Sequence, residues 1–515
     1  MLARLFSTLV ATTALLSAQN DYNLDKLSPG RLGASLDLAV SGAPANQLIL
    51  YVVSTNGGPV PLAAIDPLDS RFMEVGIDLL DVLTVAATSP TGQSSLNVPF
   101  PNDPALQGGV LHWQSVMLQL GTNFFGQLGN KVVTQLGLPG VPTTAPASLA
   151  NARAFAAGLV DANNNAGAGD VLITGGGGGT LTAATGLAST ELFDFRRLAR
   201  TPGPNMSTAR ALHLAVRLAD NRVLLIGGAD ATGVVLSSGE IYNPTTNTFT
   251  PAASMSTPRI LHAACRLADG RVLVAGGTSA LQPDVTAAIL GTLNSCEIYN
   301  PATNTWSATA SLGGARLGPA LTLLPSNQVL VSGGVQVSVL FGIPIAASSV
   351  TTTQRWNPTT GTWGAGAPMA AGRAGHHYNQ VTLADGRVLM TGGVNIPNLL
   401  GATTAAPIAG AEAYNPTTNT WQTFNMPNAR ALHTATRLPD GRVVCAGGAQ
   451  GTLLAPTSID LVDVFNPATN TWSPANVLSQ PRASHVAQLL PDSTLALFGG
   501  QGASFSLSDI ELLRY

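Results

Sequence analysis

Seven pairs of adjacent glycines recur at nearly even intervals in this chain of 515 residues. The spacings between successive pairs are 52, 49, 57, 59, 55 and 52 residues, and the pairs are Gly175-Gly176, Gly227-Gly228, Gly276-Gly277, Gly333-Gly334, Gly392-Gly393, Gly447-Gly448 and Gly499-Gly500. A period of roughly 50 residues predicts a series of similar supersecondary units that bury apolar surface against one another. Because short apolar runs and turn residues surround each pair, we expect four-stranded β-propeller blades rather than helical repeats.

The clearest unit runs from Asp269 to Trp306 and contains DGRVLVAGG, a variable segment and CEIYNPATNTW. Its Asp-Gly pair lies between two apolar runs, which predicts a tight turn joining strands one and two. The glycine pair ends strand two, where the missing side chains let backbones pass closely at the crowded centre of a ring. Strand three carries Glu-Ile-Tyr, and an Asn-Pro turn leads into strand four. We expect the aromatic residue of strand four to pack between neighbouring blades rather than bind a sugar; across the repeats it is Phe249, Trp306, Trp363, Trp421 or Trp472.

These landmarks stay in register from Arg153 to Tyr515 and resemble the kelch repeat. The resemblance implies a seven-bladed kelch-type β-propeller over residues 151–515. The last blade has three strands and lacks the fourth, and an uncovered sheet edge invites aggregation. Residues 137–150 have the composition of a linker, and their second half resembles the ends of the other fourth strands. We therefore predict that this segment also supplies the strand that closes the ring.

The N-terminal part of the chain has a different organisation. Residues 21–136 alternate short apolar runs with turn residues and show no long helical periodicity, which predicts an antiparallel β-sandwich. The expected fold class is therefore all-β, an N-terminal β-sandwich followed by the propeller. Residues 1–18 combine Arg4, an apolar run and small residues, the pattern of a secretory signal peptide, and we expect cleavage after Ala18. The alternative is an uncleaved membrane anchor, although the apolar run is shorter than the roughly 20 residues of a spanning helix. We expect a secreted protein, extracellular or periplasmic.

Composition excludes several kinds of partner. Charged residues make up 10% of the chain, the net charge is −3, and the two lysines are Lys26 and Lys131. Without a basic stripe for a phosphate backbone, nucleic-acid binding is not expected. Residues 19–515 contain no apolar run long enough for a membrane span. Of the three cysteines, Cys265 and Cys296 are assigned to strands one and three of one blade, too far apart for a disulfide, so we expect buried free thiols.

Variable connections follow the glycine pairs, and strand alternation places them together on one face of the ring. The longest are residues 278–295, 335–353 and 394–411, and they are unusually apolar. Loops on a rigid scaffold often carry function, and apolar loops that face water usually cover something. We therefore predict ligand binding on this face, with Val339 and Phe341 as candidate contacts. The alternative is that these loops pack on one another or on the N-terminal domain.

An Arg-x-x-His motif opens strand one in five blades. A ring of imidazoles suggests a metal site, but positions repeated around a ring diverge, whereas zinc needs converging ligands. We expect these residues to make structural hydrogen bonds instead. Blade five departs from the repeat with a second histidine and a tyrosine. The candidate ligand-binding residues are therefore Arg373, His376, His377, Tyr378 and Arg430, together with the two loop residues named above.

The Arg-x-x-His, Asp-Gly-Arg-Val and Gly-Gly units also resemble galactose oxidase and related copper-radical oxidases. That resemblance implies two tyrosines, two histidines and a cysteine cross-linked to a tyrosine, with a Tyr-His pair at the repeat histidine. Here the preceding residues are Leu212, Leu261, Gly375, Leu432 and Ser484. We therefore predict no catalytic residues, no metal and no cofactor, and a non-catalytic protein that binds a protein or glycan. The alternative is a carbohydrate-active enzyme, a galactose-oxidase-like oxidase or an epimerase similar to the kelch sialic-acid epimerases.

Overall fold

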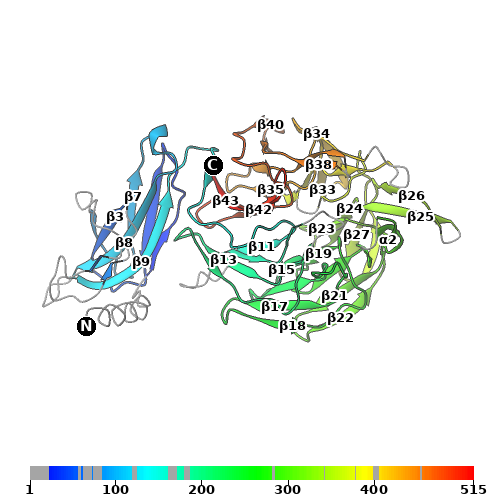
Figure 1. Cartoon of the computed structure of the whole chain (residues 1–515), viewed down its shortest axis with the longest axis horizontal. Helices are drawn as coiled ribbons and strands as arrows, with labels where there is room; N and C mark the ends of the chain where they lie inside the picture. The colour runs from blue at the N-terminus through cyan, green and yellow to red at the C-terminus, as the bar shows by residue number, and fades with distance from the viewer. Residues whose placement is uncertain are drawn as a thin grey trace.

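The computed structural model describes residues 23–55, 60–61, 72–73, 84–118, 125–160, 171–178, 186–280, 285–340, 343–376, 379–397, 405–452 and 455–515. The expected signal peptide, residues 1–18, lies outside these ranges. Nearly all regular structure is β-strand, which confirms the all-β prediction. An N-terminal group of strands lies beside a larger ring of sheets (Figure 1). In the described part of the chain, no helix is long and apolar enough to cross a membrane.

The N-terminal part contains two sheets that share one core. A three-stranded sheet consists of β1 (Asn23–Lys26), β2 (Ser35–Ser41) and β7 (Ser94–Pro99). A four-stranded sheet has the order β6 (Thr84–Ala87), β3 (Leu48–Ser54), β8 (Val110–Leu118) and β9 (Phe125–Gln135). Alternate residues of β2 are buried, and Leu36 and Leu38 pack in one cluster with Ile49, Tyr51 and Trp113 of the other sheet. Two sheets facing each other across such a core form a β-sandwich.

Short elements complete this part of the structure. The two-residue strands β4 (Val60–Pro61) and β5 (Phe72–Met73) pair with each other, and the 3₁₀ helix η3 spans Pro104–Leu106. Asp103 caps η3 by accepting a hydrogen bond from Ala105 N.

The described residues of the ring form seven four-stranded antiparallel sheets, one for each glycine pair. Blades one to three contain β11 (Ala157–Val160), β12 (Val171–Thr174), β13 (Thr190–Asp194), β14 (Ala199–Pro202); β15 (Leu214–Arg217), β16 (Val223–Ile226), β17 (Gly239–Asn243), β18 (Thr248–Ala252); β19 (Ala263–Arg266), β20 (Val272–Ala275), β21 (Cys296–Asn300), β22 (Thr305–Thr309). Blades four to six contain β23 (Ala320–Leu323), β24 (Val329–Ser332), β27 (Thr353–Asn357), β28 (Thr362–Ala365); β29 (Gln380–Thr382), β30 (Val388–Thr391), β33 (Gly410–Asn415), β34 (Thr420–Asn425); β35 (Thr434–Arg437), β36 (Val443–Ala446), β39 (Val462–Asn466), β40 (Thr471–Pro474).

The seventh sheet has the order β10 (Thr143–Thr144), β43 (Ser506–Arg514), β42 (Thr494–Gln501) and β41 (Val486–Leu489). Thr143 pairs with Leu512, and Thr144 pairs with Glu511. A segment that precedes blade one therefore provides the outer strand of blade seven. This pairing covers the sheet edge that the C-terminal strand would otherwise expose.

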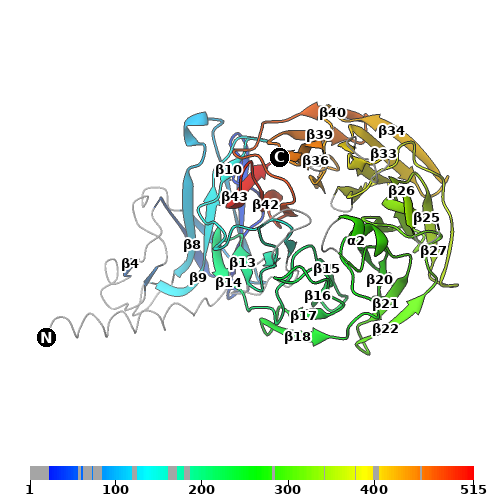
Figure 2. The same ribbon diagram turned by 45° about the vertical axis from the view of Figure 1, so that its right-hand side comes forward.

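Burial explains why the sheets stand around a centre. The first strands of neighbouring blades contact one another, as β11 does with both β15 and β41, so they are innermost. The second strands of blades one to six are buried at all four positions, because each has a strand on both sides and a blade against each face. The fourth strands are the most exposed and form the outside of the ring. Figure 2 shows the sheets arranged around the ring.

Antiparallel order gives the ring two different faces. The turns that join strands one to two and three to four lie on one side, which we call the turn face. The connections that join strands two to three, and each fourth strand to the next blade, lie on the other side, the loop face. Additional elements on the loop face are α2 (Val285–Leu290) and the hairpins β25 (Val335–Leu340) with β26 (Ile343–Ser349), β31 (Val394–Asn395) with β32 (Ala406–Pro407), and β37 (Ala449–Thr452) with β38 (Ala455–Ser458).

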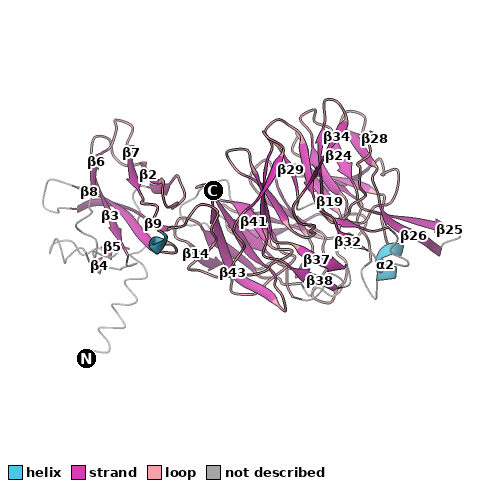
Figure 3. Cartoon of the chain, turned by 90° about the horizontal axis from the view of Figure 1, so that it is seen from above, coloured by secondary structure: helices cyan, strands magenta, loops and turns pink. Residues whose placement is uncertain are grey.

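The N-terminal sandwich contacts the turn face at blades seven and one. Lys26 Nζ lies 2.8 Å from a carboxylate oxygen of Asp492 in the strand one to two turn of blade seven, and both side chains are buried. Arg196, in the strand three to four turn of blade one, lies 3.0 Å from Asp25. Figure 3 shows the sandwich at one end of the molecule and the hairpin β25–β26 at the other. In the described structure these contacts leave the loop face uncovered.

In blades two, three, five, six and seven an aspartate side chain of the strand one to two turn accepts a hydrogen bond from a backbone N–H two residues later. Gly270 has φ +90°, and its N–H donates to Leu267 O at 3.0 Å. Asp269 Oδ1 accepts from Arg271 N at 3.0 Å, and its second oxygen pairs with the Arg271 guanidinium. In blades two, four and seven the glycine position is taken by Asn221, Asn327 and Ser493, also at positive φ. The prediction of positive φ in these turns is confirmed at the second residue of the pair.

Candidate functional site

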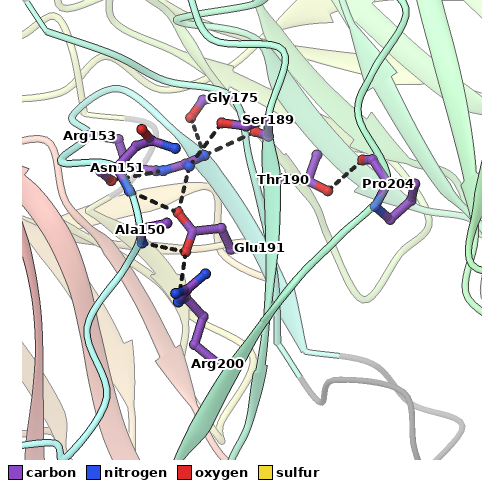
Figure 4. A network of polar contacts seen from close by, with 9 residues as sticks. All are labelled: Ala150, Asn151, Arg153, Gly175, Ser189, Thr190, Glu191, Arg200 and Pro204. Carbon is purple, nitrogen blue, oxygen red and sulfur yellow. Dashed lines mark hydrogen bonds and ion pairs between the residues drawn. The ribbon is translucent and has the colours of Figure 1, made fainter.

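The arginine at the start of each blade, which is followed by a histidine in five blades and by Ala156 in blade one, joins three parts of its blade, as Figure 4 shows for blade one. Arg153 Nη1 donates to Gly175 O at 2.9 Å and to Ser189 O at 3.1 Å. Its Nη2 lies 2.6 Å from Glu191 on strand three. Glu191 in turn accepts from Ala150 N at 2.7 Å, so the carboxylate also fixes the entry to the blade. One buried ion pair thus connects strand one, the glycine pair and strand three.

The same connection recurs around the ring. Each repeat arginine donates to the carbonyl of the first glycine of its own blade, at 2.9–3.2 Å. In six blades it also pairs with a strand-three acid, and these pairs are Arg153–Glu191, Arg210–Glu240, Arg259–Glu297, Arg373–Glu412, Arg430–Asp463 and Arg482–Glu511. Hydrogen bonds to the charged groups offset the cost of burying them. The repeat arginines therefore stabilise the interior of the blades.

Blade four departs from this pattern. Strand three carries Gln354 in place of the acid, and Arg316 donates to Gly333 O and to both oxygens of Thr352. Burial lowers the pKa of Arg316 to about 10. Gln354 Oε1 accepts from Gly313 N at 3.2 Å, which reproduces the backbone contact that the glutamates make in other blades. Blade four thus keeps the geometry of the network without its negative charge.

The glycine pairs connect adjacent blades across each seam. Gly393 N donates to Arg430 O of the next blade at 3.0 Å, and Gly500 N donates to Arg153 O at 2.8 Å, which links blade seven to blade one. A Cβ on Gly392 would lie 2.3 Å from the same Arg430 oxygen. Both glycines of every pair have positive φ. The prediction that missing side chains permit close backbone approach here is therefore confirmed.

The repeat histidines also bind across seams. His213 Nε2 lies 2.8 Å from Thr174 Oγ1 of blade one, and His433 Nε2 lies 2.8 Å from Thr391 Oγ1 of blade five. His485 makes the equivalent kind of bond to Thr434. Burial, and then the neighbouring arginine, lowers the pKa of His213 and of His485 to about 3. These imidazoles are neutral at physiological pH and act as structural hydrogen-bonding groups.

The candidate ligand-binding residues have different outcomes. Arg373, His376 and Arg430 have no exposed surface, and each forms an ion pair or a hydrogen bond within the protein. In this structure neighbouring blades cover these three side chains, so they are not at a surface that a ligand can reach. Val339 lies in β25, but its side chain is not described. Phe341, His377 and Tyr378 lie outside the described residues, so their candidate role stays a prediction.

The strand-four aromatics pack between blades as predicted. The ring centroids of Trp306 and Tyr299 lie 5.1 Å apart in a tilted arrangement, and Trp306 Nε1 donates to Ala253 O of the preceding blade at 2.8 Å. Trp363 and Trp421 make the same kind of bond to the blade before them. All six tryptophans of the chain and the described tyrosines lie in hydrophobic core clusters or, partly buried, pack against them.

The long apolar connections cover one another. Ile289 of α2 packs in one cluster with Val335 and Ala347 of the blade-four hairpin and with Ile396 and Ala405 of the blade-five connection. Ile396 N also donates to the Ser349 hydroxyl, which joins the two connections. Many of the apolar residues in these connections therefore form a small core on the loop face of blades three to five. The tips of the three hairpins lie outside the described residues.

A second group of apolar residues on the loop face is exposed. Within the described propeller, every large hydrophobic residue that is mainly exposed lies in a loop-face connection: Val234 59%, Leu290 55%, Ile345 54%, Val477 52% and Phe505 70%. In the described turns of the opposite face there is none. Sequence reasoning missed Val234, Val477 and Phe505 because their connections are short. Their position after the glycine pair, or before the next blade, was the available signal.

Among the described residues, no three histidine, cysteine, aspartate or glutamate side chains lie together as metal ligands. All three cysteines are free thiols. Burial raises the pKa of Cys265 to about 12 and that of Cys296 and Cys445 to about 11, which keeps the thiols protonated.

Comparison with known proteins agrees with this architecture. The profile described as "Kelch motif" matches residues 211–256 and 259–313, which lie in blades two and three. These two kelch motifs, together with the ring of four-stranded sheets, support a kelch-repeat β-propeller. A solved structure titled "Novel fungal alcohol oxidase with catalytic diversity among the AA5 family, in complex with copper" is similar, with 17% sequence identity and a TM-score of 0.52. The similarity covers 72% of this chain and 75% of that one.

A second solved structure, titled "Structure of YjhT", shares 14% identity at a TM-score of 0.46 and covers 65% of this chain and 99% of that one. The comparison with curated proteins gave no match. At this level of identity the oxidase shows a shared fold and does not transfer its activity.

Proposed function

We propose that this kelch-repeat propeller is a non-catalytic binding protein that holds an apolar surface of a polypeptide partner on its loop face. The observation that carries the proposal is the location of Val234, Leu290, Ile345, Val477 and Phe505, which share one face of the ring. The described turns of the opposite face carry no such residue, so the exposed apolar side chains of the ring lie on one side, and loops on a rigid scaffold often carry binding sites. The fold beneath them is held by buried ion pairs and seam hydrogen bonds, so the loops stand on a rigid base.

A polypeptide partner is favoured over a glycan by the aromatic residues. Sugar recognition relies on exposed aromatic rings that stack on the sugar, and here the tryptophans and the described tyrosines are all committed to hydrophobic clusters. In the described propeller, Phe505 is the aromatic residue with most of its surface exposed. Aliphatic side chains such as Val234 and Ile345 provide contact area for another protein and little for a polar sugar.

The test is selection of a displayed random-peptide library against the whole chain. We expect enrichment of peptides with apolar anchors, and loss of their binding in the double variant Val234→Ser/Phe505→Ser. The matched control is Leu27→Ser/Val85→Ser, which removes exposed apolar residues of the sandwich (58% and 52% exposed) and should leave binding unchanged. Peptide binding that survives the loop-face variant, or a glycan array that gives specific binding where peptides give none, contradicts the proposal.

We further propose that the protein acts outside the cytoplasm. The proposal is motivated by residues 1–18, whose pattern is that of a signal peptide. N-terminal sequencing of the protein recovered from the medium or periplasm of an expressing cell should begin at Gln19. Recovery of the intact N-terminus in the cytoplasm contradicts it.

A further inference from the structure

Charged groups are distributed unequally over the loop face. The arginines of its described connections are the seven repeat arginines, and each is at most 2% exposed. The histidines that follow them are buried as well. Lys26 and Lys131, the lysines of the chain, belong to the sandwich. The described part of the loop face therefore presents no basic side chain to solvent.

Carboxylates do reach this face, and they lie beside its exposed apolar residues. Asp230 and Val234 close one short turn, in which Val234 N donates to Asp230 Oδ1 at 3.0 Å. Asp460 lies next to Val477, because Leu478 N donates to Asp460 O at 2.7 Å. Both aspartates are partly exposed. Although burial opposes it, hydrogen bonds from Thr232 and Val234 lower the pKa of Asp230.

The turn face has the opposite character. Arg266 and Arg437 end the first strands of blades three and six and are exposed. Among the described residues neither forms an ion pair with a carboxylate, although Arg266 donates to Leu218 O at 3.0 Å. The other arginines of these turns, such as Arg271, are neutralised by the aspartate of their own turn. The charge on the loop face is thus negative, and the uncompensated charge on the turn face is positive.

We propose that the loop face takes a polypeptide segment that carries basic side chains among its apolar ones. Its apolar residues would lie on Val234, Val477 and Phe505, and its lysines or arginines would pair with Asp230 and Asp460. This inference rests on the proposed function and adds the charge of the partner. Rim ion pairs contribute modestly to affinity and mainly set association rate and partner choice, so the partner's charge should appear as selectivity.

The experiment uses three synthetic peptides with one leucine pattern and with lysine, glutamine or glutamate at the remaining positions. Fluorescence anisotropy with the whole chain should show the lysine peptide binding about tenfold more tightly than the glutamine peptide at low salt, the sum of two rim pairs. High salt should reduce this ratio, because exposed charges are screened. The glutamate peptide should bind most weakly.

Matched charge variants test whether the preference for the lysine peptide arises from the loop face. Asp230→Asn/Asp460→Asn keeps the side-chain oxygen that accepts from Val234 N and should bring the lysine to glutamine ratio close to one. Arg266→Gln/Arg437→Gln changes charge on the turn face by the same amount and should leave the ratio unchanged. Circular dichroism confirms that each variant is folded.

The outcomes separate the two proposals. If all three peptides bind equally and Val234→Ser/Phe505→Ser abolishes binding, the proposed function stands and the charge inference is overturned. If none of the peptides binds, the proposed function itself fails. A lysine preference that persists in the aspartate variant, or that disappears in the turn-face variant, places the recognition elsewhere and also overturns the inference.

Discussion

Both ends of one blade contain an arginine–carboxylate pair, but the two pairs differ in burial and in their dependence on a neighbouring blade. At the turn-face end, Asp269 and Arg271 form a half-exposed pair inside a single turn, and Gly270 provides the positive φ with no neighbouring blade required. At the loop-face end, Arg259 and Glu297 are buried, and the carbonyl of Arg259 accepts from Gly228 of the preceding blade. The turn is stabilised by its own residues, whereas the loop-face end depends on contacts between two blades.

This difference explains where the chain can vary. Because the ends of the strands below the loop face are fixed by buried charges and seam hydrogen bonds, the connections above them can change length without loosening the ring. Blade two uses a short turn there, blade three adds α2, and blades four to six add hairpins. The turn face has no such buried network, and in blades two to seven its strand one to two turns are short and similar. Variation and exposed apolar residues accordingly occur on the same side.

The largest predicted effect concerns the buried pair. Glu297→Leu removes the carboxylate from Arg259 and should lower the free energy of unfolding by about 4 kcal/mol, because it leaves a buried charge without its partner. Asp269→Asn, at the other end of the same blade, should cost about 0.5 kcal/mol, as for an exposed pair. Urea unfolding followed by tryptophan fluorescence measures both. Equal losses would mean that the two ends are not different in kind.

The next comparison is between two glycine substitutions, one at a seam between blades and one in a turn. Gly392→Ala should cost about 3 kcal/mol, because the new Cβ meets Arg430 O in addition to the strain of positive φ. Gly441→Ala, in the turn of blade six, meets nothing within 4 Å and should cost about 1 kcal/mol of backbone strain alone. Thermal and urea unfolding of the two variants give the comparison. A Gly441 variant as unstable as the Gly392 variant would contradict the role of the seam.

Acid should weaken the loop-face end before the turns. The pKa of His213 is lowered in the folded state to about 3, so below the ordinary histidine pKa of 6.5 the unfolded chain binds more protons than the folded chain. Stability is therefore complete above about pH 6.5 and falls as pH drops toward 3, by about 2 kcal/mol per such histidine at about pH 5. His213→Gln should remove the contribution of one histidine to the pH dependence of the free energy of unfolding. The check is the free energy of unfolding against pH for both proteins; unchanged slopes would show that His213 is not neutral and buried.

The smallest expected effect is a gain. Gln354→Glu gives blade four the carboxylate that six other blades have and places it beside Arg316, whose pKa burial lowers to about 10. We expect about 1 kcal/mol of added stability, because the arginine is already buried and hydrogen-bonded. Urea unfolding at neutral pH measures it. Destabilisation would mean that blade four is built for a neutral residue at this position.

Much of the fold was predictable because its determinants are local. In the glycine pairs, the Asp-Gly turns and the alternating strands, a few neighbouring residues determine the backbone conformation. The register of the repeat also places the aromatic residue of strand four. The candidate site was less predictable. Arg373, Arg430 and His376 are polar and repeat near the expected channel, which made them candidates, but the neighbouring blade buries them completely. That burial is a property of the ring and not of any one repeat.

Sequence alone determined the repeat, its kelch character and the residues that must lack a side chain, because positive φ and close backbone approach restrict which amino acids can occupy a position. Tertiary structure decided which side chains water can reach. Val234 and Phe505 are ordinary apolar residues in short connections, and Glu297 is an ordinary acid in a strand. Their different exposures follow from which surfaces neighbouring blades and connections cover, and that arrangement leaves the loop face open and the charged network closed.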